Sequence, residues 1–133
     1  MPALERLLYR SAATGSTESL LNVATLLGEA QRNNARDGLT GVLAAHDGWF
    51  LQVVEGQREV LDRLLKKLES DPRHRNIAII DRTPVSARRF ADWNMANARI
   101  TPLLKTALDR MATDPETQPG RIIDMLHEAA QPA

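Results

Sequence analysis

The sequence predicts a single α+β domain in which one β-sheet is covered by helices on both faces. Its 133 residues suffice for one domain but are few for two, and 43% of them are hydrophobic, so a proper core can be buried. Apolar runs of strand length alternate with stretches in which apolar residues recur at helical spacing. One strand is apolar on both of its sides, so both faces of the sheet require cover.

The first predicted strand spans Leu4 to Ser11. Thr14-Gly15-Ser16-Thr17 then offers an N-cap to a helix whose apolar residues recur from Leu20 to Ala30. Asn33-Asn34 and Asp37-Gly38 are expected to end this helix.

A hairpin is predicted next, with strands at Leu39 to Ala45 and Trp49 to Glu55 joined by His46-Asp47-Gly48. Gly56 is expected to break the second of these strands. A second amphipathic helix carries apolar residues from Val60 to Leu68 and is stopped by Asp71-Pro72.

Extended structure resumes at Ile77 to Asp81, and a last short strand is expected around Trp93 to Ile100. This order suits a ferredoxin-like βαββαββ sheet, a split βαβ arrangement with two helices on one face. The residues expected to cover the other face, where Trp49, Leu51 and Val53 point, are Leu103, Leu104, Leu108, Met111, Ile122, Ile123 and Leu126, on two short helices joined by a loop at 113–119. We therefore expect a core at 1–100 and a C-terminal helical extension at 101–133.

Composition excludes several classes of function. Lys+Arg and Asp+Glu number 17 each, so there is no net field to attract nucleic acid or an acidic membrane surface, and neither is expected as a partner. The absence of cysteine excludes disulfides, thiolate catalysis and a Cys-based zinc site. No other candidate metal ligand lies at a suitable sequence spacing from His46, His74 or His127, so no metal site is predicted. The N-terminal residues resemble neither a signal peptide nor a membrane span, and we expect a cytoplasmic protein.

Gln52 is the most informative polar residue, because it lies in the apolar run Phe50-Leu51-Gln52-Val53-Val54. An amide that points inward with Phe50 and Val54 must find hydrogen-bonding partners or cost about 1 to 3 kcal/mol. The chain offers Tyr9 and the pair Asn33-Asn34 as candidates for the same pocket. A ligand with polar ring edges is a third candidate.

Five motifs, in order, resemble the BLUF family of flavin-binding sensors of blue light, over most of residues 4 to 99. They are Leu8-Tyr9-Arg10-Ser11; Asn33-Asn34-Ala35-Arg36 leading to Leu39-Thr40-Gly41; Phe50-Leu51-Gln52-Val53-Val54-Glu55-Gly56; Asp71-Pro72-Arg73-His74; and Arg89-Phe90-Ala91-Asp92-Trp93-Asn94-Met95.

The resemblance implies a non-covalently bound oxidised flavin between the two helices, as FAD, with FMN or riboflavin as alternatives. Asn33, Asn34 and Gln52 would contact it, Asn34 by bonding its carbonyl and ring nitrogen, and Gln52 would bridge Tyr9 to it. Blue light would make the flavin an oxidant that takes an electron and a proton from Tyr9, and the Gln52 amide would then rotate or tautomerise, which shifts absorption to the red. The chain would be a photoreceptor and not an enzyme.

The resemblance also places Lys67, Asp71, Arg73 and His74 beside the ribityl chain and phosphate of the cofactor, with Asp71 and Arg73 the best candidates. The alternative is a solvated helix end, where basic residues complement the helix dipole.

Trp93 and Met95 share a strand face by their parity, and in the family such a pair exchanges places near the flavin and transmits the switch to the last strand and the tail. Met95 is the stronger candidate. Many relatives are expected to carry a hydroxyl residue four positions before Asn34, where this chain has Ala30. One possible partner of the Gln52 amide is therefore missing, which would affect the lifetime of the light state. The output would pass to a separate protein partner, and a homo-oligomer is expected.

Each residue alone has a simpler interpretation. Tyr9 could be a half-buried aromatic residue of a strand, and Gln52 could hydrogen-bond the backbone of a loop. The two asparagines could end a helix, and Trp93 and Met95 could be packing residues of the core. Two other functions stay open on the residues alone. One is a flavin enzyme, for which no catalytic base or nucleophile is evident, and the other is a ligand-free interaction module on a ferredoxin-like scaffold.

Overall fold

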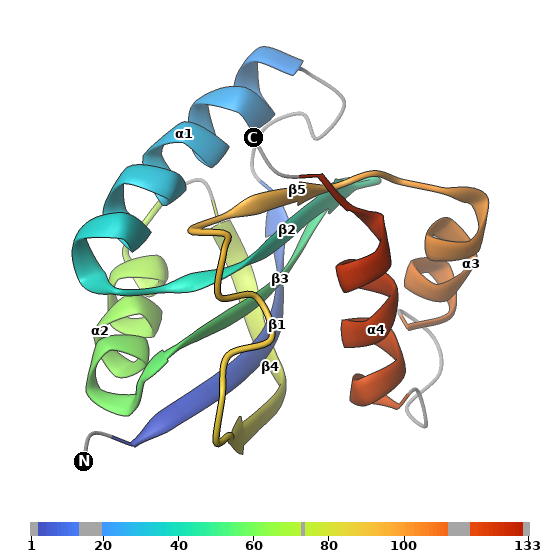
Figure 1. Cartoon of the computed structure of the whole chain (residues 1–133). Helices are drawn as coiled ribbons and strands as arrows, with labels where there is room; N and C mark the ends of the chain where they lie inside the picture. The colour runs from blue at the N-terminus through green and yellow to red at the C-terminus, as the bar shows by residue number, and fades with distance from the viewer. Residues whose placement is uncertain (1–2, 14–19, 73, 112–117, 132–133) are drawn as a thin grey trace.

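A central β-sheet separates two pairs of helices in the computed structural model, which describes residues 3–13, 20–72, 74–111 and 118–131 (Figure 1). Helices α1 and α2 lie on one side of the sheet and α3 and α4 on the other. The elements are β1 (Leu4–Ala13), α1 (Leu20–Asp37), β2 (Thr40–His46), β3 (Trp49–Gln57), α2 (Arg58–Glu69), β4 (His74–Pro84), β5 (Ala96–Ala98), α3 (Pro102–Met111), α4 (Pro119–Ala129) and β6 (Ala130–Gln131).

The strands of the described sheet lie in the order β4-β1-β3-β2-β5-β6. The first four strands are antiparallel neighbours, and their order 4-1-3-2 is that of a ferredoxin-like sheet. β5 adds to the edge of β2 in parallel, and the two-residue β6, which was not predicted, pairs with β5. The predicted α+β class and its βαββαββ order are confirmed.

Successive residues of β3 point to opposite faces of the sheet, as strand geometry requires. Phe50 and Val54 belong to the core that the sheet forms with α1 and α2. Leu51 and Val53 belong to the second core, where the buried residues from α3 and α4 are Leu104, Ile122, Ile123 and Leu126. The two C-terminal helices therefore cover the second face, as the apolar residues of the tail predicted.

Helix α1 continues to Asp37, so the expectation that Asn33-Asn34 end it is wrong. The helix ends at the second predicted signal, where Gly38 has a positive φ of 71°. The backbone N–H of Leu39 donates to the carbonyl of Asn34 at 2.9 Å, which is the six-to-one bond of a Schellman motif. Asn33 and Asn34 therefore lie in the last turns of α1, where their side chains have fixed directions.

Strand boundaries also differ from the prediction at two places. β3 runs through Gly56 to Gln57, because Gly56 pairs with Glu5 of β1. A Cβ at Gly56 would lie 2.3 Å from Leu39 Cδ2, so glycine lets the Leu39 side chain pack against the strand here and does not break it. The last strand is confined to Ala96–Ala98, so Trp93 and Met95 precede it.

Two predicted loops lie wholly or mostly outside the described residues: the N-cap segment at 14–17 and the connection at 113–119, of which 118 and 119 are described. Among the helices that the structure describes, none combines the length and apolar character required to span a bilayer.

Candidate functional site

A cavity of about 320 Å³ opens between α1, α2 and the sheet face that carries Phe50 and Val54. Its volume lies at the lower end of the range for small-molecule sites. Its inner wall is formed by buried residues from β1, β2, β3 and α1, together with Met95 from the connection before β5. The exposed charged residues that also line it are Arg36, Asp37, Arg63 and Lys67.

Tyr9 and Gln52 meet in this wall. They are direct partners in the β1–β3 register, and the Tyr9 hydroxyl donates to Gln52 Oε1 at 2.7 Å. Both side chains are buried, with exposed fractions of 1% and 6%. Burial raises the pKa of the Tyr9 phenol far above its usual value, so the hydroxyl keeps its proton at neutral pH.

Asn34 reaches the cavity from the last turn of α1, and its Nδ2 donates to the backbone carbonyl of Asn94 at 2.6 Å. Met95 follows Asn94, lines the same cavity and is 3% exposed. The structure therefore brings Tyr9, Gln52, Asn34 and Met95 together from four separate segments.

Only some of the other predicted site residues line the cavity. Asn33, Lys67 and Asp71 line the cavity. Arg73 lies outside the described residues, and His74 is placed only as the first residue of β4, opposite Ala13 of β1.

Trp93 does not share a face with Met95, so this part of the prediction is wrong. Its side chain packs with the core under α3 and α4, whereas Met95 packs with the core under α1 and α2. Both residues precede β5, in an irregular segment where side chains do not alternate between two faces as they do in a strand.

Comparison with family models matches residues 4–96 to a single family, BLUF, sensors of blue-light using FAD. The chain belongs to the BLUF family. This confirms the resemblance seen in the motifs and, with it, a function in blue-light sensing by a bound flavin.

Individual BLUF relatives agree with this assignment. Photoactivated adenylate cyclase subunit beta of Euglena longa is 33% identical over 121 residues, which cover 82% of this chain and 13% of that protein. Because the chain spans only about 13% of that relative, the cyclase activity in the relative's name is not transferred to this chain.

Two solved structures match the whole domain. BlrB, a BLUF protein in its dark state, is 30% identical with a TM-score of 0.77, over 97% of this chain and 96% of BlrB. BlsA in its ground state is 28% identical with a TM-score of 0.84, over 98% of this chain and 91% of BlsA. The family's description makes the BLUF domain described here a sensor of blue light.

One buried carboxylate of the BLUF domain, that of Glu55, was not predicted from the sequence. Glu55 is fully buried on the sheet face opposite Gln52 and accepts four hydrogen bonds. The donors are Arg6 Nε at 2.8 Å, Thr40 Oγ1 at 3.2 Å, and the backbone N–H groups of Arg89 and Phe90, each at 2.8 Å. A charged residue at the end of an apolar strand was the signal that could have revealed it.

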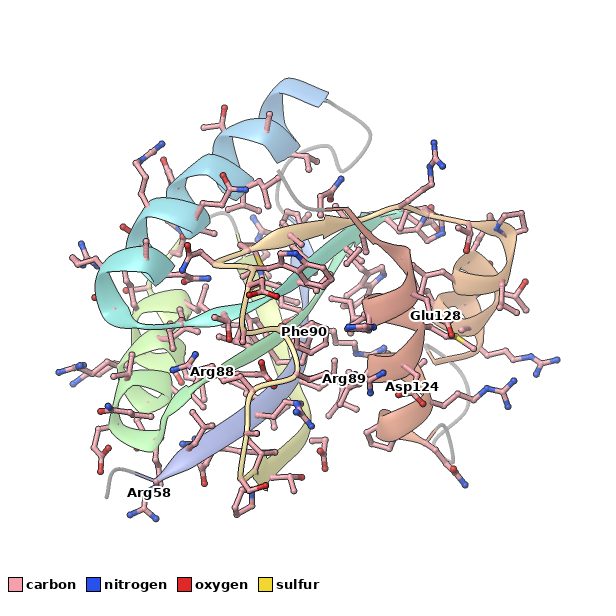
Figure 2. The ribbon with its side chains drawn as sticks, viewed as in Figure 1. Arg58, Arg88, Arg89, Phe90, Asp124 and Glu128 are labelled. Atoms are coloured by element: carbon pink, nitrogen blue, oxygen red, sulfur yellow. The ribbon has the colours of Figure 1, made fainter. Side chains whose placement is uncertain are left out.

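The Glu55 contacts fix the start of a segment, residues 88–95, that forms the later part of the connection from β4 to β5. Arg88, Arg89 and Phe90 at its start are labelled in Figure 2. Arg89 forms an ion pair with Asp124 of α4. Phe90 and Trp93 both pack against His127 of α4. The ring centroid of His127 lies 5.5 Å from that of Phe90 and 5.6 Å from that of Trp93. The 88–95 segment therefore contacts the cavity through Met95 and α4 through Arg89, Phe90 and Trp93.

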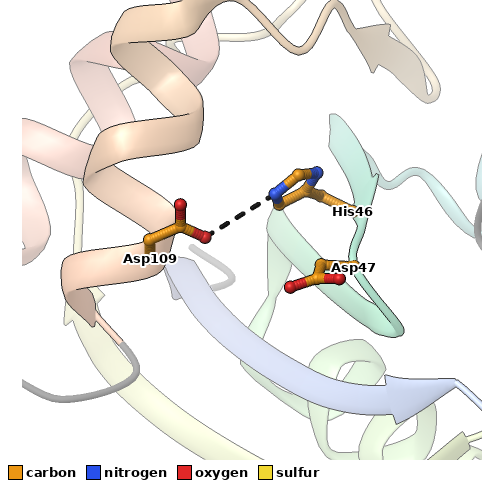
Figure 3. A group of neighbouring side chains, drawn as sticks. All are labelled: His46, Asp47 and Asp109. Carbon is orange, nitrogen blue, oxygen red and sulfur yellow. Dashed lines mark ion pairs between the residues drawn. The ribbon is translucent and has the colours of Figure 1, made fainter.

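A second polar cluster, formed by His46, Asp47 and Asp109, lies between the β2–β3 hairpin and α3 (Figure 3). His46 Nε2 is 3.7 Å from Asp109 Oδ1. A hydrogen bond from Lys105, with the charges of Lys105 and His46, holds the pKa of the Asp109 carboxyl below its usual value. The contact joins the hairpin to α3, a proximity that sequence spacing did not indicate.

Proposed function

We propose that this BLUF domain senses blue light through the hydrogen bond between Tyr9 and Gln52, which would change when a flavin bound in the adjacent cavity is excited. The observation that supports this mechanism is the 2.7 Å bond from the Tyr9 hydroxyl to Gln52 Oε1 in the cavity wall.

The residues that line the cavity fit an isoalloxazine ring. A flavin ring has apolar faces and one edge with carbonyl and ring-nitrogen groups, and the cavity offers apolar walls from Leu43, Val54 and Leu64. Asn34 and Gln52 supply amides at its buried side, and each amide carries both donors and an acceptor. We propose that these two amides hold the polar edge of the ring, with Asn33 beside them.

Tyr9 is the proposed electron donor, because it is the only aromatic residue among the described residues that line the cavity. A bound flavin, once excited by blue light, supplies an acceptor for an electron and a proton. Because the buried phenol is neutral, Tyr9 would lose both together and later recover both, so that no net oxidation of the protein results.

The Gln52 amide is the group proposed to stay changed after Tyr9 has recovered its electron and proton. In the described state its Oε1 accepts from Tyr9, so its amino group is the donor that remains for the ring. If the amide rotates or tautomerises while Tyr9 lacks its proton, the two partners receive different hydrogen bonds although no backbone atom moves. A new bond to the ring would lower its excitation energy and shift absorption to the red.

The test is an absorption spectrum before and after blue illumination. Tyr9→Phe and Gln52→Leu should both bind flavin, because other residues line the cavity, but both should lose the reversible red shift. Gln57→Leu, an exposed glutamine at the end of the same strand, is the matched control and should keep the full shift. A normal shift in Gln52→Leu would refute the proposed role of the amide, and a wild-type protein that stays colourless with flavin would refute the function.

We also propose that the cofactor is FAD. The support is the exposed cationic group of Arg36, Arg63 and Lys67 at the cavity, which suits phosphate groups, with Asp71 on the same rim and Arg73 and His74 proposed from the sequence. Chromatography of the released flavin identifies it as FAD, FMN or riboflavin. Lys67→Ala should weaken binding of FAD but not of riboflavin.

The signal is proposed to leave through α4 to a separate protein partner. The support is the 88–95 segment, which contacts both the cavity and α4. The division into a core at 1–100 and an extension at 101–133, a homo-oligomeric state and a cytoplasmic location remain predictions from the sequence. Light-dependent hydrogen exchange in α4, measured with the oligomeric mass, tests this route.

A further inference from the structure

Two amide side chains on the same face of α1 donate to consecutive carbonyls of the 88–95 segment. Asn34 Nδ2 bonds the carbonyl of Asn94 at 2.6 Å, and Gln31 Nε2 bonds the carbonyl of Met95 at 3.0 Å. Residues 31 and 34 are three apart in a helix, so they are neighbours on its surface. The end of the 88–95 segment is therefore held to α1 by two hydrogen bonds from side chains.

The two amides differ in their relation to the cavity. Of the described residues, those lining the cavity include Asn34 and Met95 but not Gln31. A substitution at Gln31 therefore changes the hold on the 88–95 segment without removing a residue from the proposed flavin contacts. Gln31 is half-buried, so its bond to the Met95 carbonyl is partly shielded from water.

The start of the same segment is held differently. The Glu55 carboxylate bonds the N–H groups of Arg89 and Phe90, and the N–H of Gly41 in β2 donates to the Trp93 carbonyl at 2.9 Å. The residues in these contacts are not among those that line the cavity, whereas Met95 lines it and the Asn94 carbonyl is bonded by Asn34, which also lines it. A rearrangement that begins at Gln52 and reaches Met95 would therefore release the α1 end first.

We propose that Gln31 is a positioning residue for the light switch. It holds the Met95 carbonyl in the dark state and releases it in the light state, which frees the 88–95 segment to move against α4. This inference rests on the proposed function, since it needs the Tyr9–Gln52 reaction to start the movement. Among the described residues, Gln31 is not one of those that line the cavity proposed for the flavin.

The size of the effect follows from the net value of one hydrogen bond, which corresponds to roughly 2- to 12-fold in an equilibrium constant. Without the Gln31 donor, the dark position of the segment loses this advantage over the light position. Return to the dark state should then slow by up to about 12-fold, according to how much of the bond is re-formed at the barrier.

A direct test uses infrared difference spectra, light minus dark, of holoprotein labelled with carbonyl ¹³C at methionine. The chain has four methionines, Met1, Met95, Met111 and Met125, and the band missing from Met95→Leu identifies the Met95 carbonyl. In the wild type this band should move to higher frequency on illumination, as a carbonyl does when it loses a hydrogen bond. In Gln31→Leu, which has similar volume but no donor and adds no labelled carbonyl, it should already lie at the higher frequency in the dark.

The controls separate this inference from the proposed function. Gln31→Leu should keep the visible red shift, and Arg32→Leu, at an exposed neighbour on α1, should match the wild type in every readout. A Met95 band that does not move in the wild type, or that moves equally in Gln31→Leu, overturns the role of Gln31 while the photoreceptor function stands. If Gln31→Leu folds poorly, Gln31→Ala repeats the comparison, and the wild-type band remains decisive by itself.

Discussion

Replacement of Glu55 by glutamine is expected to destabilise the protein strongly while leaving its light response intact. Oε1 of Glu55 accepts from Thr40 Oγ1 and the N–H of Phe90, and Oε2 accepts from Arg6 Nε and the N–H of Arg89. A glutamine must put an amino group at one of these positions, where it faces two donors. The substitution thus leaves two donors without an acceptor.

Each buried donor without a partner costs about 1 to 3 kcal/mol, so two cost about 2 to 6 kcal/mol. The Arg6 side chain is 20% exposed, and water can hydrate it in part. We therefore expect the free energy of unfolding to fall by about 2 to 4 kcal/mol. Urea titration followed by circular dichroism measures this as a lower midpoint at an unchanged slope.

Glu5→Gln is the matched control, because Glu5 lies on the neighbouring strand and bonds Arg82 Nε at 2.8 Å near the edge of the sheet. Its loss should be about 1 kcal/mol or less. The red shift should persist in Glu55→Gln, since Tyr9 and Gln52 lie on the other face of the sheet. If Glu55→Gln is no less stable than Glu5→Gln, the four bonds to this carboxylate do not support the fold as argued.

Two further predictions concern Tyr9 and Gly41. Tyr9 is the only tyrosine of the chain, so the ultraviolet absorption of tyrosinate reports on it alone, and none should appear in the folded protein near pH 10. Because burial raises the pKa of Tyr9 in the folded protein, the unfolded chain loses this proton at lower pH. The contribution of the protonated phenol to the free energy of unfolding is therefore complete below about pH 10, and above it falls by up to about 1.4 kcal/mol per pH unit. Tyr9→Phe should lack this pH dependence. Gly41→Ala would place a Cβ 1.9 Å from the carbonyl oxygen of Val53 and should cost at least about 3 kcal/mol in urea titrations, whereas Gly120→Ala in α4, with nothing within 4 Å, should be neutral or slightly stabilising. Tyrosinate at pH 10 in folded protein, or a stable Gly41→Ala, would contradict the packing described.

The elements that could be predicted from the sequence are those set by local pattern. Strict alternation in β3 decides which side chains face α1 and α2, and this places Gln52 on the cavity side once the strand is assigned. The cost of burying an amide left three candidate partners for Gln52, namely Tyr9, the pair Asn33-Asn34 and a ligand. The antiparallel register places Tyr9 opposite Gln52.

The elements that could not be predicted depend on contacts between distant residues. Asn34 was assigned to a helix end by its residue type, but α1 ends three residues later at Asp37, where the Leu39 N–H closes a Schellman motif onto the Asn34 carbonyl. Glu55 bonds backbone groups 34 and 35 residues away, and Arg89 pairs with Asp124 at a similar separation. Nothing in the local sequence encodes such pairings, because they arise only when the 88–95 segment lies across the sheet.

The alternation of β3 also explains how one strand can serve both the proposed light reaction and the proposed signal route. Gln52 faces the cavity, and three residues later Glu55 faces the opposite side, where it fixes the N–H groups at the start of the 88–95 segment. The far end of that segment returns to the cavity at Met95, where α1 holds it through Gln31 and Asn34. A segment fixed at one end to the sheet that carries the switch, and at the other to the helix beside the flavin cavity, can respond to a change at Gln52 without any movement of β3. Since Phe90 and Trp93 lie between these ends and contact His127, α4 is the element that such a response reaches first.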